Sequence, residues 1–126
     1  MGEINESFPH QIKFAKMQYK FQTWLYSNGY EFTDGEAYRT QEQQDIYFAN
    51  GKSKKKYSKH QDRLARDYIL YIDGVCQINN PEAYRKPGEY WESLGGRWGG
   101  RFGVDPSKYS TKIGWDSNHF EYRKII

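Results

Sequence analysis

The chain has 126 residues, 37% of them hydrophobic and 18% aromatic, and its formal net charge is +3. This length fits one domain with one modest core, and so many aromatic residues argue against a disordered chain. No apolar run is long enough to span a membrane, so no membrane insertion is expected. The mild positive charge favours an anionic partner, such as nucleic acid or a bacterial wall polymer, without choosing between them.

The single cysteine and the N-terminal segment bear on the compartment. Because Cys76 is the only cysteine of the sequence, it cannot form an intramolecular disulfide. Its place in "DGVCQI" is typical of a small apolar residue that fills space in a strand. The segment "MGEINESFPHQIKF" has no apolar stretch of the kind found in secretory signals. We therefore expect synthesis in the cytoplasm, with any exit by another route.

The first half of the chain predicts a helix, two short strands and a second helix. Apolar residues at mostly helical spacing indicate a helix over residues 10–28, and Asn28-Gly29 is a stop signal. The stretch "YEFTDGEAYRT" predicts strand, turn and strand. Thr40 and Gln43 then form a capping-box pattern that opens a helix ending at Asn50-Gly51.

Residues 52–59 contain five lysines, which should repel one another and keep this segment in solvent. The segment is either a loop without a role or an attractor of an anionic polymer. The following stretch, "LARDYILYIDGVCQI", predicts a β-hairpin that turns at Asp73-Gly74. A period of two places Asp67 on one face with Ala65, Ile69 and Tyr71.

The last third predicts a helix, a glycine-rich loop and a final strand. Asn80-Pro81 favours a helix start, but Pro87-Gly88 predicts a break before "EYWESL". "LGGRWGGRFG" (94–103) has five glycines, which is typical of a tight loop near a site or a core edge. "HFEYRKI" alternates like a strand. The element order predicts an α+β fold, with a small antiparallel sheet and flanking helices in a single domain, residues 1–126.

Histidines and carboxylates near the expected strands offer a metal site. His60 and Asp67 flank the start of one strand, and His119 opens the last strand three residues after Asp116. Two imidazoles and one carboxylate suit zinc with an open fourth position, and a nearby carboxylate would take a proton from bound water. Spacing alone leaves an alternative in which these are ordinary polar surface groups. His10 has no acidic neighbour in sequence and is set aside.

The stretches "SKHQDRLARD" and "WDSNHFE" resemble the zinc peptidases of the D-alanyl-D-alanine carboxypeptidase and VanY/VanX family, and most closely the phage L-alanyl-D-glutamate endopeptidases. That family's pattern is Ser-x-His, six residues, Asp, and a late Asp/Glu-x-x-His. Matching residues here are Ser58, His60, Ala65, Asp67, Asp116 and His119. "YRTQEQQ" and "RWGGRFG" resemble two further family elements, so the resemblance covers roughly residues 35–122.

The resemblance implies a role for each matched residue. His60, Asp67 and His119 would bind Zn²⁺, and Asp116 would be the general base and later the acid. Arg39 would stabilise the developing oxyanion or hold a substrate carboxylate, unless it is a surface arginine at a helix start.

Three further residues would support the site. Ser58 and Gln43 would lie beside it, and Glu121 would either orient a ligand or be an exposed strand residue. Two departures from the family pattern are Arg63, where a glycine is usual, and the helix break expected at Pro87-Gly88.

The implied function is a zinc-dependent peptidoglycan peptidase that cleaves the L-Ala–D-Glu bond of the murein peptide stem. It would be a monomeric phage lysis enzyme, made in the host cytoplasm and released to the wall by a holin. One alternative is a D-Ala-D-Ala carboxypeptidase or dipeptidase. The other is a basic, aromatic-rich domain that binds nucleic acid or glycan without catalysis, although no nucleic-acid-binding motif is visible and no such partner is expected.

Overall fold

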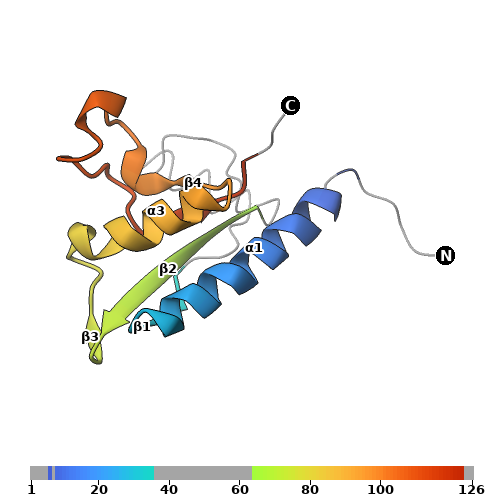
Figure 1. The fold of residues 1–126 in the computed structure, drawn as a ribbon, viewed down its shortest axis with the longest axis horizontal. Helices are drawn as coiled ribbons and strands as arrows, with labels where there is room; N and C mark the ends of the chain where they lie inside the picture. The colour runs from blue at the N-terminus through green and yellow to red at the C-terminus, as the bar shows by residue number, and fades with distance from the viewer. Residues whose placement is uncertain (1–5, 7, 36–63, 124–126) are drawn as a thin grey trace, which may run out of the picture.

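The computed structural model describes residue 6 and residues 8–35 and 64–123 (Figure 1). Within this part, the long helix α1 and the shorter helix α3 pack on a small antiparallel sheet. The strand order is β1-β2-β5-β4, and β3 also pairs with β2. The expected α+β fold is confirmed, and none of the helices in the described residues is long and apolar enough to cross a membrane.

Helix α1 spans Phe8–Ser27, two residues longer at its start than the sequence predicts. Pro9 lies in the first turn, where a missing backbone N–H costs no helical hydrogen bond. The helix ends before Gly29, whose φ of 85° suits a residue without a Cβ. One stripe of the helix is buried, at Phe14, Phe21 and Leu25.

The strands are β1 (Tyr30–Asp34), β2 (Ala65–Ile72), β3 (Val75–Cys76), β4 (Arg97–Trp98) and β5 (His119–Glu121). The long strand β2 organises the sheet, because β1, β3 and β5 all pair with it in antiparallel register. The predicted hairpin is confirmed: β2 turns into β3 at Asp73 and Gly74, which both have positive φ as a two-residue hairpin turn requires. β4 completes the sheet on the free edge of β5.

Helix α3 corrects the predicted break at Pro87-Gly88. A 3₁₀ turn, η1 (Pro81–Tyr84), leads directly into α3 (Arg85–Ser93), which continues through both residues. Pro87 falls within the first turn of α3, where its missing N–H has no helical partner. Gly88 allows close packing, since a Cβ added at this position would overlap the indole ring of Trp98.

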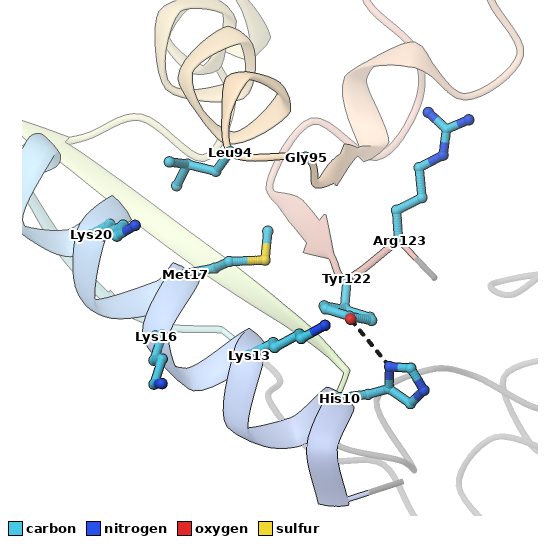
Figure 2. Close-up of a pocket in the computed structure, with 9 residues that line it drawn as sticks. All are labelled: His10, Lys13, Lys16, Met17, Lys20, Leu94, Gly95, Tyr122 and Arg123. Carbon is cyan, nitrogen blue, oxygen red and sulfur yellow. Dashed lines mark hydrogen bonds between the residues drawn. The ribbon is translucent and has the colours of Figure 1, made fainter. Parts of the chain in front are cut away.

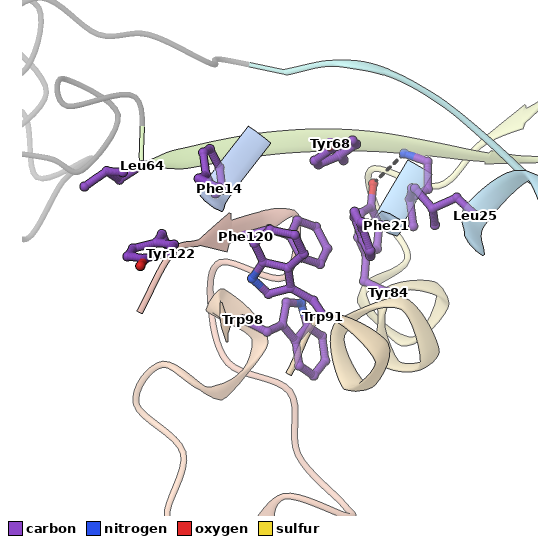
Figure 3. Close-up of a cluster of buried hydrophobic side chains, with 11 residues drawn as sticks. Phe14, Phe21, Leu25, Leu64, Tyr68, Tyr84, Trp91, Trp98, Phe120 and Tyr122 are labelled. Atoms are coloured by element: carbon purple, nitrogen blue, oxygen red, sulfur yellow. Dashed lines mark hydrogen bonds between the residues drawn. The ribbon is translucent and has the colours of Figure 1, made fainter. Parts of the chain in front are cut away.

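The core is largely aromatic and lies between the sheet and the two helices (Figure 3). Phe21 of α1 is fully buried and meets the rings of Tyr68, Trp91 and Phe120 at centroid distances of 5.1, 5.2 and 4.7 Å. The buried polar tips of the core rings are paired as well. Tyr84 accepts a hydrogen bond from the Leu70 backbone N–H (3.0 Å). Strands β2 and β5 and both helices are therefore held by one shared set of rings.

Two further expectations are corrected. Cys76 is exposed at the end of β3, so it is not an apolar filler. The glycine-rich segment 94–103 is not only loop, because it contributes β4 and a short 3₁₀ turn, η2 (Gly99–Arg101). The expected helix after Thr40 and the lysine-rich segment 52–59 lie outside the described residues.

Candidate metal centre

The pairing of β2 with β5 brings together two residues that are far apart in sequence. Asp67 and His119 are direct cross-strand partners. The imidazole Nδ1 of His119 lies 3.1 Å from Oδ1 of Asp67, and both side chains are largely shielded from solvent, at 9% and 14% exposure. Ligands of one tetrahedral zinc ion, each about 2.0–2.1 Å from the metal, lie roughly 3.3 Å apart. An oxygen and a nitrogen donor thus stand at a separation that suits zinc.

Glu121 holds the other side of the same imidazole. It lies two residues along β5, on the same face as His119, and only 2% of it is exposed. The Nε2–H of His119 donates a hydrogen bond to Oε1 of Glu121 at 2.9 Å. A ligand histidine whose second nitrogen donates to a carboxylate has its ring orientation and tautomer fixed. The structure therefore presents Nδ1 as the nitrogen available to a metal.

The protonation of His119 follows from these carboxylates. Burial by itself would lower its pKa, but hydrogen bonds to Asp67 and Glu121, together with the charges of Asp67 and Asp116, outweigh that effect and raise the pKa to about 9. A bound metal ion would take the place of the proton on Nδ1, because the negative carboxylates around the imidazole attract a cation.

Asp116 approaches the pair from the turn before β5. Its Oδ2 lies 3.7 Å from His119 Nδ1, and its side chain is 38% exposed. The turn is closed by the His119 N–H, which donates to the Asp116 backbone carbonyl at 3.0 Å. Asp116 is thus the more solvent-accessible of the two aspartates beside Nδ1.

The Trp-Gly-Gly segment, residues 98–100, packs against this turn. Trp98 Nε1–H donates to the backbone carbonyl of Ser117 at 2.6 Å. A Cβ added at Gly99 would overlap the Asp116 carbonyl oxygen and approach the Cβ of His119. A glycine is required here because the backbone of residue 99 lies directly against the turn.

An aromatic and cationic wall flanks His119. The ring of Phe102 lies 5.6 Å from the imidazole and 5.9 Å from the indole of Trp115, which is 63% exposed. The Arg97 guanidinium stacks over Phe102 at 4.6 Å and lies 3.8 Å from Oε2 of Glu121. Sequence reasoning did not single out Arg97, Phe102 or Trp115 as site residues, although "RWGGRFG" and "WDSNHFE" pointed to their segments.

Four of the predicted site residues are brought together: Asp67, Asp116, His119 and Glu121. The exposed-strand alternative for Glu121 is wrong, since its side chain is buried. The other four, Arg39, Gln43, Ser58 and His60, lie outside the described residues, as does Arg63. Among the described residues alone, no group of three or more His, Cys, Asp or Glu side chains is arranged to hold a metal ion. His10, set aside above, lies near Tyr122, with its Nδ1 3.1 Å from the phenol oxygen.

No protein-family model matches the sequence, and no curated protein matches it. Solved structures are similar. The L-Ala D-Glu endopeptidase ChiX of Serratia marcescens has a TM-score of 0.60 at 18% identity, over 91% of this chain and 79% of that chain.

Two structures of VanY-type enzymes are similar as well. A mutant of the vancomycin-resistance D,D-pentapeptidase VanY from a VanB-type cassette, in complex with Zn(II), has a TM-score of 0.55 at 20% identity, over 88% of this chain and 71% of that one. VanYB in complex with D-alanine-D-alanine also gives 0.55 at 20% identity, over 90% and 71%. As the motifs predicted, this chain has the fold shared by the L-Ala D-Glu endopeptidase ChiX and the D,D-peptidases of the VanY type.

Proposed function

We propose that this protein is a zinc-dependent peptidase that hydrolyses an amide bond in the peptide stem of bacterial peptidoglycan. The observation that carries the proposal is the convergence of Asp67, Asp116 and Glu121 on the two nitrogens of His119. This cluster lies within a fold that known peptidoglycan peptidases share. A domain that only binds nucleic acid or glycan has no need of a buried histidine between three carboxylates.

Asp67 and His119 would hold the metal, with His60 as the third protein ligand predicted from the sequence. Bound zinc would make a water molecule acidic and polarise the scissile carbonyl. Glu121 keeps the ring of His119 in place through the hydrogen bond to Nε2, and its burial excludes water from that bond.

Asp116 would carry the proton. Its carboxylate stands beside Nδ1 yet remains partly open to solvent, where a substrate amide would arrive. It would accept a proton from the attacking water as the new C–O bond forms. It would then donate that proton to the amide nitrogen as the C–N bond breaks, so one residue acts first as base and then as acid.

For the bond that is cut, we propose the L-Ala–D-Glu linkage. The aspartate at position 116 supports this choice, because the endopeptidase branch that the motifs resemble has aspartate there. A D-Ala-D-Ala carboxypeptidase or dipeptidase is the second candidate, since one similar structure is a complex with D-alanine-D-alanine.

The direct test is a digest of purified peptidoglycan by zinc-loaded protein, followed by mass spectrometry of the products. Cleavage between L-Ala and D-Glu releases the stem from its L-Ala, whereas a carboxypeptidase releases only terminal D-Ala. The Asp116→Asn variant, loaded with zinc in the same way, is the control for contaminating hydrolases. Unchanged muropeptides with a protein that contains stoichiometric zinc would overturn the proposal.

We further propose that the protein is a lysis enzyme that reaches the wall after a holin-type pore opens. The support is its resemblance to phage endopeptidases. Expression in a bacterial cytoplasm should leave cells intact until the inner membrane is permeabilised, and the culture should then clear within minutes. Clearing before permeabilisation would contradict this route.

A further inference from the structure

A hollow lies away from the candidate metal centre, between α1, the end of α3 and the segment after β5 (Figure 2). Its volume is about 360 Å³. The residues that line it are His10, Lys13, Lys16, Met17, Lys20, Leu94, Gly95, Tyr122 and Arg123. We refer to it as the α1 pocket.

The rim of the α1 pocket is positively charged. Lys13, Lys16 and Lys20 lie at positions i, i+3 and i+7 of α1, which places them along one face of the helix. Arg123 stands across from them. Helix α1 contains no Asp or Glu, so nothing on the helix itself offsets this row of charge. Like charges at these spacings destabilise a helix unless an anion compensates them.

The described arginines outside the rim behave differently. Arg66 pairs with Asp34, Arg85 with Glu82, and Arg101 with Glu92. No described acidic residue forms such a pair with any of the four rim cations. The exposed lysines Lys86, Lys108 and Lys112 also form no ion pair with a described acidic residue, so what distinguishes the rim is that its four cations surround one pocket.

The floor of the pocket is apolar and firmly held. Met17 and Leu94 are half-buried and pack against the hydrophobic core. Tyr122 is 7% exposed, and its hydroxyl is within hydrogen-bond distance of His10. The pocket therefore joins an apolar base to a rim of four cations.

The α1 pocket and the metal centre lie on opposite faces of the sheet. Successive side chains of a strand alternate between the two faces. His119 and Glu121 of β5 point to the metal centre, whereas Phe120 packs in the core beneath α1, and Tyr122 continues on that side. A ligand in the pocket can remain bound while a peptide occupies the centre.

We propose that the α1 pocket binds a polyol-phosphate polymer of the bacterial wall, with its phosphodiester groups on the lysine row. The row from Lys13 to Lys20 is roughly 10 Å long at 1.5 Å per residue, so a chain of repeating phosphates engages more of it than a single anion does. Carbon atoms of the polyol would rest on Met17 and Leu94. The choice of a wall polymer rests on the proposed function, whereas the anion preference rests on the charges alone.

Nucleic acid also carries phosphodiesters, but single-stranded binding sites add exposed aromatic rings on which bases stack. Of the two rings that line the pocket, Tyr122 is buried, and the half-buried imidazole of His10 packs against it at a centroid distance of 5.4 Å. The proposal therefore favours a polymer without bases.

The test measures binding, not hydrolysis, so its failure is distinct from failure of the peptidase proposal. The probe is a synthetic poly(glycerol phosphate) oligomer, titrated into the full chain by calorimetry at several salt concentrations. The variants are K13A/K16A/K20A, the charge-conserving K13R/K16R/K20R, and the control K86A/K108A/K112A, which removes three exposed lysines elsewhere. A DNA oligonucleotide with equal numbers of phosphates and inorganic phosphate are the comparison ligands.

If the lysine row binds the phosphates, K13A/K16A/K20A should weaken poly(glycerol phosphate) binding by at least about 10-fold. The affinity of this variant should also depend less on the salt concentration. K13R/K16R/K20R and the control should stay within about 2-fold of wild type. Cleavage of a small soluble muropeptide should be unchanged in all of them. Equal losses in the lysine-row variant and the control would overturn the proposal, as would equal affinity for DNA or for inorganic phosphate.

Discussion

Asp116 and Asp67 both approach the same nitrogen of His119, yet their surroundings differ. Asp67 is held by a strand and shielded, whereas Asp116 sits on a turn with its side chain 38% exposed. Asp116→Asn should keep about one zinc per chain and lose catalysis by at least about 10²-fold, because an amide cannot accept the proton. Asp67→Asn should lose zinc and activity together. Zinc content and turnover, measured on the same preparations, check both variants, and the reverse pattern would exchange the two roles.

Glu121 offers a second test at this scale. Glu121→Gln keeps the size of the side chain and an oxygen that can accept from Nε2, but it removes the charge that orients the imidazole. Zinc affinity should fall by about 10–100-fold, while activity at saturating zinc falls less. Glu89→Gln, at an exposed position on α3, is the matched control and should leave zinc affinity unchanged. Equal zinc affinities of Glu121→Gln and wild type would show that this carboxylate does not support the ligand.

The residues of the centre were predictable to different degrees. Asp67, Asp116 and His119 were singled out by the resemblance of their motifs to a known family, whereas spacing alone left open that they are ordinary polar surface groups. The stacking of Arg97 on Phe102 was not predictable, since it depends on β4, a strand of only two residues that pairs with β5 across 20 or more positions.

At the scale of elements, α3 shows where local rules fail. Pro and Gly inside a helical pattern predict a break, but Pro87 is tolerated in a first turn and Gly88 is needed by a neighbour. That neighbour, Trp98, is ten residues further along the chain, so propensity alone could not reveal the contact. The hairpin at Asp73-Gly74, by contrast, is encoded locally and was predicted correctly.

Gly88→Ala tests this explanation by the sign of its effect. In an ordinary helix the change stabilises by roughly 0.5–1 kcal/mol. Here the new methyl group meets the buried ring of Trp98, so we expect a destabilisation of about 1–3 kcal/mol from overpacking. Urea denaturation measures the free energy of unfolding, and Lys86→Ala, an exposed position in the same helix, is the control. A gain in stability for Gly88→Ala would refute the packing role.

For the whole molecule, metal binding and folding should be linked. A ligand that binds only the native state stabilises it, by about 2.7 kcal/mol when its concentration is 100 times Kd. The Tm of the wild type should therefore rise with added zinc and fall with a chelator. His119→Ala removes a central ligand and should show neither shift. Calorimetric scans with and without zinc decide this, and an equal rise in the variant would place the metal elsewhere.

The general fold was predictable because helix, hairpin and strand patterns each agree with an α+β arrangement. The sheet order was not, since β5 comes last of the described strands in sequence but lies between β2 and β4. The position of β5 depends on long-range contacts of the aromatic core, and local periodicity cannot predict such contacts.

That placement of β5 constrains when the protein can become active during its synthesis. A growing chain presents β2 early, but one edge of that strand stays unpaired and Asp67 lacks its partner until residue 121 has left the ribosome. Pairing segments more than 50 residues apart is slow, because the loop must close before any contact compensates for it. Partly made chains that end before β5 therefore contain no assembled centre, and Asp67 and His119 come together only after that strand has been made.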